Sequence, residues 1–360
     1  MEGTSTMLII DGSIGEGGGQ ILRTALGLAA VLRKPIKVIN IRAKRRNPGL
    51  QRQHLTGVKA IATITNAHVE GAYLGSTTLY FEPRELRCGE FVFDVGTAGS
   101  VTLVLQTLLP VLPYLPCRSI IEIRGGTDVP WSPPVDYMRY VFIPLARLCG
   151  TKIELELIRR GHYPRGGGIV KLYVEPTYSL NSIELIERGA LKVIRGRSHC
   201  VKLPKHVAER QARAAYEYLY QRLKIPIDIE IEFYDPSKDP HLGPGSGIVL
   251  YAITEKSILG ADSLGARGKP AEHVGQEAAM KLVEELESNA AVDRHAADML
   301  VPLMVLAKGK SIVVASKLTL HTATVIEIAK SIIPEIAVSV STSELGKPVR
   351  IEVQGIGLEL

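Results

Sequence analysis

A glycine-rich segment near the start of the chain has the composition of a phosphate-binding turn. Gly15-Glu16-Gly17-Gly18-Gly19-Gln20 separates an apolar run from a predicted helix. Glycines let backbone amides approach an anion, and a helix start presents unpaired amides and positive charge. Glu16 would repel phosphate unless it bound a divalent cation, which suggests a metal role. The segment lacks the Gly-Lys-Ser/Thr of a Walker A loop, and a tight strand-to-helix turn is the alternative interpretation.

A second segment, residues 42–54, concentrates positive charge: it contains five Lys or Arg residues and no acid. Arg42 and Arg45 offer guanidinium groups suited to bidentate phosphate contacts, and Gln53 and His54 add hydrogen-bonding groups. Arg23, one helical turn beyond the glycine segment, is placed to join them. The alternative is an ordinary solvated basic loop.

His321 lies at a predicted strand-to-helix junction, in residues 319–324. A helix N-terminus disfavours the imidazolium form, so the ring stays neutral with its lone pair available. A neutral imidazole can attack the α-phosphorus of a nucleotide. The alternative is a hydrogen-bonded structural histidine, the interpretation we also apply to His162, His206 and His241.

The segment from His295 to Met299 opens another predicted helix. Asp298 in this otherwise apolar stretch has two interpretations. It can cap backbone donors, which is the default for an aspartate near a helix start, or it can hold a ribose or an adenine.

The elements that must position these residues follow a recurring pattern of β-branched run, turn and apolar helix, with further strand pairs. The pattern predicts an α+β fold made of a repeated unit, with each repeat too small to bury its own sheet. Residues 1–186 and 288–360 should therefore form one discontinuous domain, with sheets inside or helices shared. Residues 187–287 break this rhythm and predict a smaller inserted α+β domain, with a long charged helix over about 204–223.

Composition sets broader limits. The 360 residues are 46% hydrophobic and carry a net charge of +6, which favours polyanionic partners. Aromatic residues make up only 5%, so a base-stacking platform is not expected. The four cysteines are widely spaced, which predicts reduced thiols without a zinc site or disulfides. We find no signal peptide or membrane-length apolar run, and we expect a cytoplasmic protein without membrane contact.

Taken together, these motifs resemble those of the RNA 3′-terminal phosphate cyclases, and the similarity covers nearly the whole chain. Several ordered segments carry it, which makes it more specific than any single motif. They are Asp11-Gly12 with residues 15–23, Pro48-Gly49-Leu50 with residues 52–55, Gly99-Ser100 with residues 105–107, residues 125–128 with Pro133-Pro134, Tyr163-Pro164 with residues 166–168, and Gly243-Pro244-Gly245.

The resemblance implies a large domain of three repeated βαβαββ-type units and a smaller inserted domain. It also implies a reaction in three steps. His321 would take AMP from ATP, AMP would pass to an RNA 3′-phosphate, and the adjacent 2′-hydroxyl would attack to give a 2′,3′-cyclic phosphate. The partners are then ATP and RNA with a 3′-phosphate end, with Mg²⁺ or Mn²⁺ as cofactor; a homodimer is possible.

By the same matching, the resemblance places the adenylate against a set of residues listed here: Gln106, Pro133, His295, Ala296, Ala297, Asp298 and Met299. Glu16 would lie near the metal and triphosphate. Phosphates of ATP or RNA would contact Arg23, Arg42, Arg45, Gln53 and His54. The bacterial pattern has a tyrosine and a glutamine where this chain has His295 and Met299. Because Met299 cannot donate amide hydrogen bonds, the choice between ATP and GTP stays open.

Two alternatives remain. The non-catalytic branch of the same family acts in ribosome assembly and lacks the nucleophile, so the presence of His321 argues against it. The enolpyruvyl transferases contain a related repeat, but they need two repeat-built domains of similar size.

Overall fold

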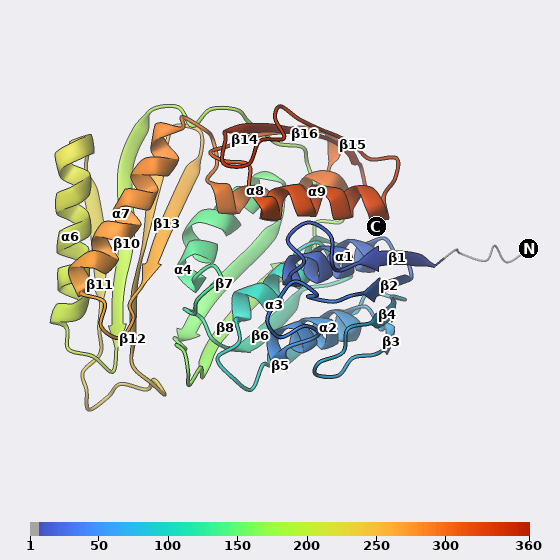
Figure 1. Cartoon of the computed structure of the whole chain (residues 1–360), viewed down its shortest axis with the longest axis horizontal. Helices are drawn as coiled ribbons and strands as arrows, with labels where there is room; N and C mark the ends of the chain where they lie inside the picture. The colour runs from blue at the N-terminus through green and yellow to red at the C-terminus, as the bar shows by residue number, and fades with distance from the viewer. Residues whose placement is uncertain (1–6) are drawn as a thin grey trace, which may run out of the picture.

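The computed structural model describes residues 7–360 as four mixed four-stranded sheets with helices packed on them (Figure 1). This architecture confirms the predicted α+β class. No helix in this part of the chain is long and apolar enough to cross a membrane.

Three of the sheets share one pairing scheme. The first two strands in chain order are parallel neighbours, and the last two form an antiparallel pair beside the second strand. The first sheet contains β1 (Leu8–Asp11), β2 (Ile36–Ile39), β3 (His68–Glu70) and β4 (Leu79–Glu82). The second contains β5 (Glu90–Asp94), β6 (Ser119–Gly125), β7 (Lys152–Arg159) and β8 (Gly168–Glu175). The third contains β9 (Glu184–Leu185), β14 (Lys308–Ala315), β15 (Ala337–Val340) and β16 (Val349–Ile356).

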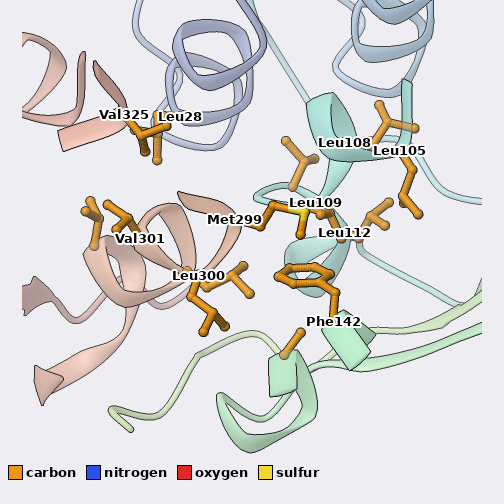
Figure 2. Packing of buried hydrophobic residues seen from close by; sticks show 14 of the residues in the cluster. Leu28, Leu105, Leu108, Leu109, Leu112, Phe142, Met299, Leu300, Val301 and Val325 are labelled. Atoms are coloured by element: carbon orange, nitrogen blue, oxygen red, sulfur yellow. The ribbon is translucent and has the colours of Figure 1, made fainter. Parts of the chain in front are cut away.

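The helices that connect these strands meet one another in the interior. Of the two arrangements that we expected, sheets inside or helices shared, the structure therefore shows the second. They are α1 (Gly19–Val31), α2 (Arg52–Ile64), α3 (Val101–Leu108), α8 (Arg294–Leu306) and α9 (Leu320–Ile332). Helix α1 contacts α2, α3 and α9, and α8 packs against α9. Figure 2 shows side chains from these helices gathered in one apolar cluster, among them Leu28, Leu105, Met299 and Val325. This packing holds the starts of α1, α8 and α9 in fixed positions.

A set of short helical segments completes this part of the molecule, with one segment before β6 and the other three after it. It comprises η1 (Leu112–Tyr114), α4 (Val135–Tyr137), the π-helical segment η2 (Met138–Phe142) and α5 (Ile143–Leu148). We expected one continuous helix over about 134–148; the π-helical turn in its middle was not predicted.

The fourth sheet lies at the left of Figure 1, with strand order β11-β10-β12-β13. Its elements are β10 (Leu191–Val201), α6 (His206–Leu223), β11 (Ile227–Glu232), β12 (Gly245–Thr254), β13 (Ile258–Leu264) and α7 (Ala271–Glu287). Side chains of α6, α7 and these strands form a hydrophobic cluster of their own, while α4 and η2 contact β12 and β13 from the large part of the molecule. Strand β13 was missed in the sequence.

The cysteine prediction was wrong for two of the four residues. Cys88 and Cys117 form a disulfide, whereas Cys149 and Cys200 are free and buried. Strands β5 and β6 are parallel, with Glu90 opposite Ile120. The two chain segments that enter these strands therefore run side by side and bring the two thiols together. Local spacing in the sequence does not reveal such a long-range pairing.

Candidate active site

A cavity of about 360 Å³ opens where α1, α8 and α9 begin. The fourth sheet, called the inserted sheet below because its strands lie between β9 and β14 in the chain, contributes to its lining together with α7. The cavity is lined by Gln20, Arg23, Leu103, Gln106, Trp131, Ser132, Pro133, Tyr137, Asp262, Lys281, His295, Asp298, Met299 and His321. Seven of the residues that we predicted for the site are in this set. They come from segments spread over almost three hundred residues of sequence.

The glycine segment packs tightly against the basic loop. Lys44 Nζ donates to the carbonyl of Gly15 at 2.9 Å. A Cβ atom on Gly17 would lie 2.6 Å from the Lys44 side chain, and one on Gly18 would lie 2.3 Å from the guanidinium of Arg45. Gly15 and Gly17 also have positive φ angles of 49° and 58°. Glycine is therefore required here both by backbone conformation and by the close approach of the two cations.

His321 is the second residue of α9, and its helix start is fixed by Thr319, whose side chain accepts from the Thr322 amide at 3.0 Å. The imidazole is half exposed, and its Nδ1 lies 3.2 Å from Oε2 of Glu16, a nearly buried carboxylate. Burial lowers the pKa of His321, and the charges of Arg23 and Arg45 lower it further, while Glu16 opposes them. This lowered pKa favours the neutral ring at neutral pH.

Arg45 and Arg23 place positive charge around Glu16 and His321. Arg45 Nη2 pairs with Glu16 Oε2 at 2.7 Å. Arg23 donates to Oε1 of Gln20 at 2.6 Å, but its Nε is buried and has no hydrogen-bond partner among the described residues. Burial lowers the pKa of Arg23 to about 10, so the group stays charged. Because Arg23 lines the cavity, its charge can act on an anion bound there.

Helix α8 forms the opposite wall, and its N-cap is Asp293 rather than Asp298. Asp293 Oδ1 accepts from the amides of His295 and Ala296, both at 2.9 Å. The capping interpretation of Asp298 was therefore wrong, because this residue lies one turn further on and faces the cavity. Burial raises the pKa of Asp298 to about 7, against the opposing charges of His295 and Arg23. Perturbed carboxyls of this kind are common in functional sites.

Gln106 and Met299 contact each other across the inner end of the cavity, where Gln106 Nε2 lies 3.2 Å from Met299 Sδ. Met299 is 5% exposed and also packs into the apolar cluster of Figure 2. The donors of Gln106 are thus held by a weak acceptor, which leaves them available for a better one.

Seven predicted site residues are not among those that line this cavity, and two of them, Glu16 and Arg45, form the ion pair beside His321 described above. Ala296 and Ala297 are buried within α8. Arg42 Nη1 donates to the carbonyls of Asn47 and Gly49, within the basic loop. Gln53 Oε1 accepts from the amide of Ser100, the N-cap of α3. His54 Nδ1 accepts from the amide of Gln51 in a capping box of α2.

Residues from two other regions were missed. Asp262 of β13 and Lys281 of α7 bring the inserted sheet to the cavity, and Trp131 stands at its rim. Trp131 is 97% exposed and has a φ of 61°, a conformation that a bulky residue adopts at a cost. The Pro-rich loop around Trp131 signalled a turn, but nothing in the sequence indicated that Asp262 and Lys281 would approach it.

The predicted metal position has a single carboxylate. Glu16 Oε1 accepts from the Gln20 amide at 3.2 Å, and Oε2 pairs with Arg45. Among the described residues, Glu16 belongs to no group of three potential ligands. An ion here would draw most of its ligands from a triphosphate and water, which is how Mg²⁺ is commonly bound in nucleotide sites.

Comparisons with known proteins identify the family. A family model described as RNA 3′-terminal phosphate cyclase matches residues 14–338. The chain is 56% identical over 353 residues to the RNA 3′-terminal phosphate cyclase of Hyperthermus butylicus, covering 97% of this chain and 98% of that protein. Its identity to the protein of the same name from Ignicoccus hospitalis is 56% over 350 residues, covering 97% and 99%.

Among solved structures, the chain is similar to the enolpyruvyl transferase NikO from Streptomyces tendae. The identity is 9% and the TM-score 0.40, over 97% of this chain and 48% of that one; a likeness this weak carries no argument. The match to the family model over most of the chain, and the two relatives that align over their full length, lead to one conclusion. This chain belongs to the RNA 3′-terminal phosphate cyclase family.

Proposed function

We propose that this protein converts an RNA 3′-terminal phosphate into a 2′,3′-cyclic phosphate with ATP, through a histidine–AMP intermediate on His321. The observation that carries the proposal is the placement of the His321 imidazole in the lining of a cavity that is also lined by the cation Arg23. A nucleophile next to a site for anions is what nucleotidyl transfer requires. The names of the relatives support the same activity.

His321 is suited to the first step. The Glu16 carboxylate near Nδ1 favours the tautomer with its proton on that nitrogen, which leaves the lone pair on Nε2. Nε2 would attack the α-phosphorus of ATP, forming a P–N bond while the bond to pyrophosphate breaks. The negative charge that develops on the phosphates would be stabilised by Arg23 and Arg45.

The second and third steps use the same phosphorus chemistry. An oxygen of the RNA 3′-phosphate would attack the phosphorus of the adenylate, and the P–N bond would break to return the neutral imidazole. The 2′-hydroxyl would then lose its proton and attack the 3′-phosphorus, expelling AMP. A phosphate monoester is a poor electrophile until it carries such a leaving group, whereas the neighbouring hydroxyl is already in position.

The cavity supports a nucleotide site between α3 and α8. Gln106, Pro133, His295 and Asp298 would surround the adenosine, with Met299 at the inner end. Because the amide donors of Gln106 are held only by a thioether, they are free to contact the base or ribose. We propose that the nucleotide bound here is ATP rather than GTP.

We propose an indirect effect on the phosphates for Arg42, Gln53 and His54. Their hydrogen bonds shape the basic loop and the starts of α2 and α3, so these residues would position Arg23 and Arg45. Mg²⁺ or Mn²⁺, with Glu16 as the protein ligand, would neutralise the charge of the triphosphate.

Trp131 offers a site for the RNA end. An exposed indole held at the rim of the cavity can stack on a nucleobase of any type. We propose that the terminal base of the RNA lies on Trp131 while its 3′-phosphate reaches the adenylate on His321. The aromatic content of 5% led us to expect no base-stacking platform. A single exposed aromatic residue at the rim is nevertheless enough to stack on one base.

Three further points belong to the proposal. The common pairing scheme of three sheets supports three repeated units, and the separate hydrophobic cluster supports an inserted domain over 187–287. A cytoplasmic location agrees with an ATP-dependent reaction on RNA. A homodimer is retained as a proposed assembly.

The direct test is incubation with α-labelled ATP and MgCl₂, without RNA. The wild-type protein should form an acid-labile, base-stable AMP adduct, and His321→Ala should form none. The matched control is His68→Ala, because it alters an exposed histidine on β3 that is far from His321 in the sequence. This variant should label fully. A wild-type protein that stays unlabelled with both Mg²⁺ and Mn²⁺ would instead favour the ribosome-assembly branch.

A further inference from the structure

A second cluster of histidines lies where the inserted sheet meets the large part of the molecule. His199 is on β10 of the inserted sheet, His162 follows β7, and Asp128 follows β6. All three are buried, with 1%, 7% and 2% of their surfaces exposed. None of them lines the cavity around His321, and the proposed reaction uses none of them.

The donor atoms of these three side chains converge. The Nε2 atoms of His162 and His199 are 3.0 Å apart, and His199 Nε2 lies 3.9 Å from Asp128 Oδ1. One ligand atom from each of the three lies within 4.8 Å of the others. Ligands about 2.0–2.1 Å from a tetrahedral ion are about 3.3 Å apart. The observed separations therefore need adjustments on the order of 1 Å to enclose an ion.

The surrounding charges leave room for a cation beside Asp128. The buried guanidinium of Arg160 contacts three carboxylates, those of Asp128, Asp136 and Glu232. Asp136 has a second guanidinium, that of Arg139, and Glu232 has that of Arg197. Asp128 accepts from Nη1 of Arg160 and from the Thr127 hydroxyl, and among the described residues it pairs with no second guanidinium. A buried carboxylate with a fraction of one counter-charge is costly, and an ion at the histidine pair would offset this.

The backbone is shaped to admit the His162 ring. A Cβ atom on Gly245, at the start of β12, would lie 2.1 Å from Cγ of His162. Any larger residue at this position would push the imidazole away from His199. The inserted sheet thus supplies one ligand and also the space that another ligand occupies.

We propose that Asp128, His162 and His199 form a binding site for a divalent transition-metal ion, with Zn²⁺ as the best match, which ties the inserted sheet to the large part of the molecule. Two imidazoles and one carboxylate are ligands typical of zinc and its neighbours, whereas Mg²⁺ and Ca²⁺ prefer oxygen. Three protein ligands leave a fourth position for water. The site is separate from the proposed Mg²⁺ position at Glu16.

The test measures metal directly. Untagged protein is produced in medium with added ZnCl₂, passed through gel filtration, and analysed for bound metal by mass spectrometry. We expect close to one Zn²⁺ per chain in the wild type, and loss of the ion in His162→Gln and His199→Gln. Glutamine keeps a polar group in place, so these variants protect the fold better than alanine. His68→Gln, the matched control at an exposed position, should keep its ion.

Two further measurements separate binding from folding. Wild-type protein produced with CoCl₂ should show the visible absorption of a four-coordinate Co²⁺, which needs no variant at all. Removing the ion with a chelator should lower the Tm of the wild type and the control and leave both glutamine variants unchanged. A wild-type chain with neither zinc nor the cobalt spectrum overturns the proposal, as does an ion that both glutamine variants retain.

Discussion

Two regions of this molecule set histidine beside carboxylate, and they differ in access. His321 is half exposed at the mouth of a cavity, next to one carboxylate and two guanidinium groups. His162 and His199 are buried at the junction of the inserted sheet, facing each other. An exposed neutral ring can attack a bound phosphorus, whereas two enclosed rings can only bind each other or an ion. The exposure of the imidazole ring therefore distinguishes these two roles of histidine.

The largest expected effect comes from removing the proposed nucleophile. His321→Ala should lower formation of the cyclic phosphate by roughly 10³-fold or more, because the proposed first step forms its P–N bond on Nε2 of this ring. Its Tm should match that of the wild type, since the ring is half exposed. Product formation is measured with a 3′-phosphorylated oligonucleotide and ATP. Residual activity within about tenfold of wild type would assign the chemistry to another residue.

At the junction between the inserted sheet and the large part of the molecule, we expect a substitution to lower stability. Arg160→Ala leaves three carboxylates without their common guanidinium, which should lower the free energy of unfolding by about 3–5 kcal/mol. Denaturant titration measures this loss, with the exposed Arg195→Ala as the control. If Arg160→Ala left stability unchanged, the junction would not be the rigid polar contact that the structure indicates.

The rim of the cavity gives a smaller effect that depends on RNA alone. Trp131→Ala should weaken RNA binding by about 1–3 kcal/mol, the value of one base stacked on an aromatic ring. Labelling by ATP in the absence of RNA should not change. Trp131→Phe should recover part of the lost affinity. Equal binding of RNA by the alanine variant, measured by fluorescence anisotropy, would contradict the stacking proposal.

The smallest effect is a shift in pH dependence. The pKa of His321 is below its ordinary value of 6.5, so the contribution of this ring to adenylylation should be lost only as the pH drops through that lowered pKa, whereas Asp298, with a pKa of about 7, titrates near neutral pH. Glu16 opposes the lowering of the His321 pKa. Glu16→Gln should therefore move the acid limb to still lower pH, and also reduce the rate because the ring loses the carboxylate that orients it.

The pH profile is recorded from AMP labelling of both proteins. An acid limb of Glu16→Gln that moved to higher pH would mean that Glu16 does not face the imidazole in solution. Asp11→Asn is a suitable control, because this carboxylate lies on β1 and contacts Ser13 and Asn40 rather than the site.

Much of the cavity could be predicted because its residues occur in recognisable local patterns. A glycine run before a helix, a basic loop and a histidine at a helix start each have a physical reason that can be read from neighbouring residues. The structure places His321, Glu16 and Arg45 together. Family resemblance was still needed to connect these segments, since no local rule states that residues 16 and 321 meet.

The contributions of the inserted sheet were not predictable in this way. Asp262 lies on a strand that we missed, and its burial beside the cavity depends on how two sheets pack. His162 was interpreted as structural, and neither the Cys88–Cys117 disulfide nor the approach of His199 was foreseen. In each case the informative contact joins segments that are distant in the sequence: the disulfide links the entries to two strands of one sheet, and the other contacts link different sheets. Such contacts follow from topology, which periodicity and spacing do not specify.

The contact between Gly15 and Thr324 joins an early and a late part of the chain, which bears on when this region is completed during translation. The amide of Glu16 donates to the Thr324 hydroxyl, and these residues are 308 positions apart. A Cβ atom on Gly15 would lie 2.2 Å from the same hydroxyl. The glycine segment therefore leaves the ribosome long before the helix that completes it. Under the proposed mechanism, a growing chain would hold the first part of its nucleotide site without His321, so it could not react with ATP until nearly all of it has been translated.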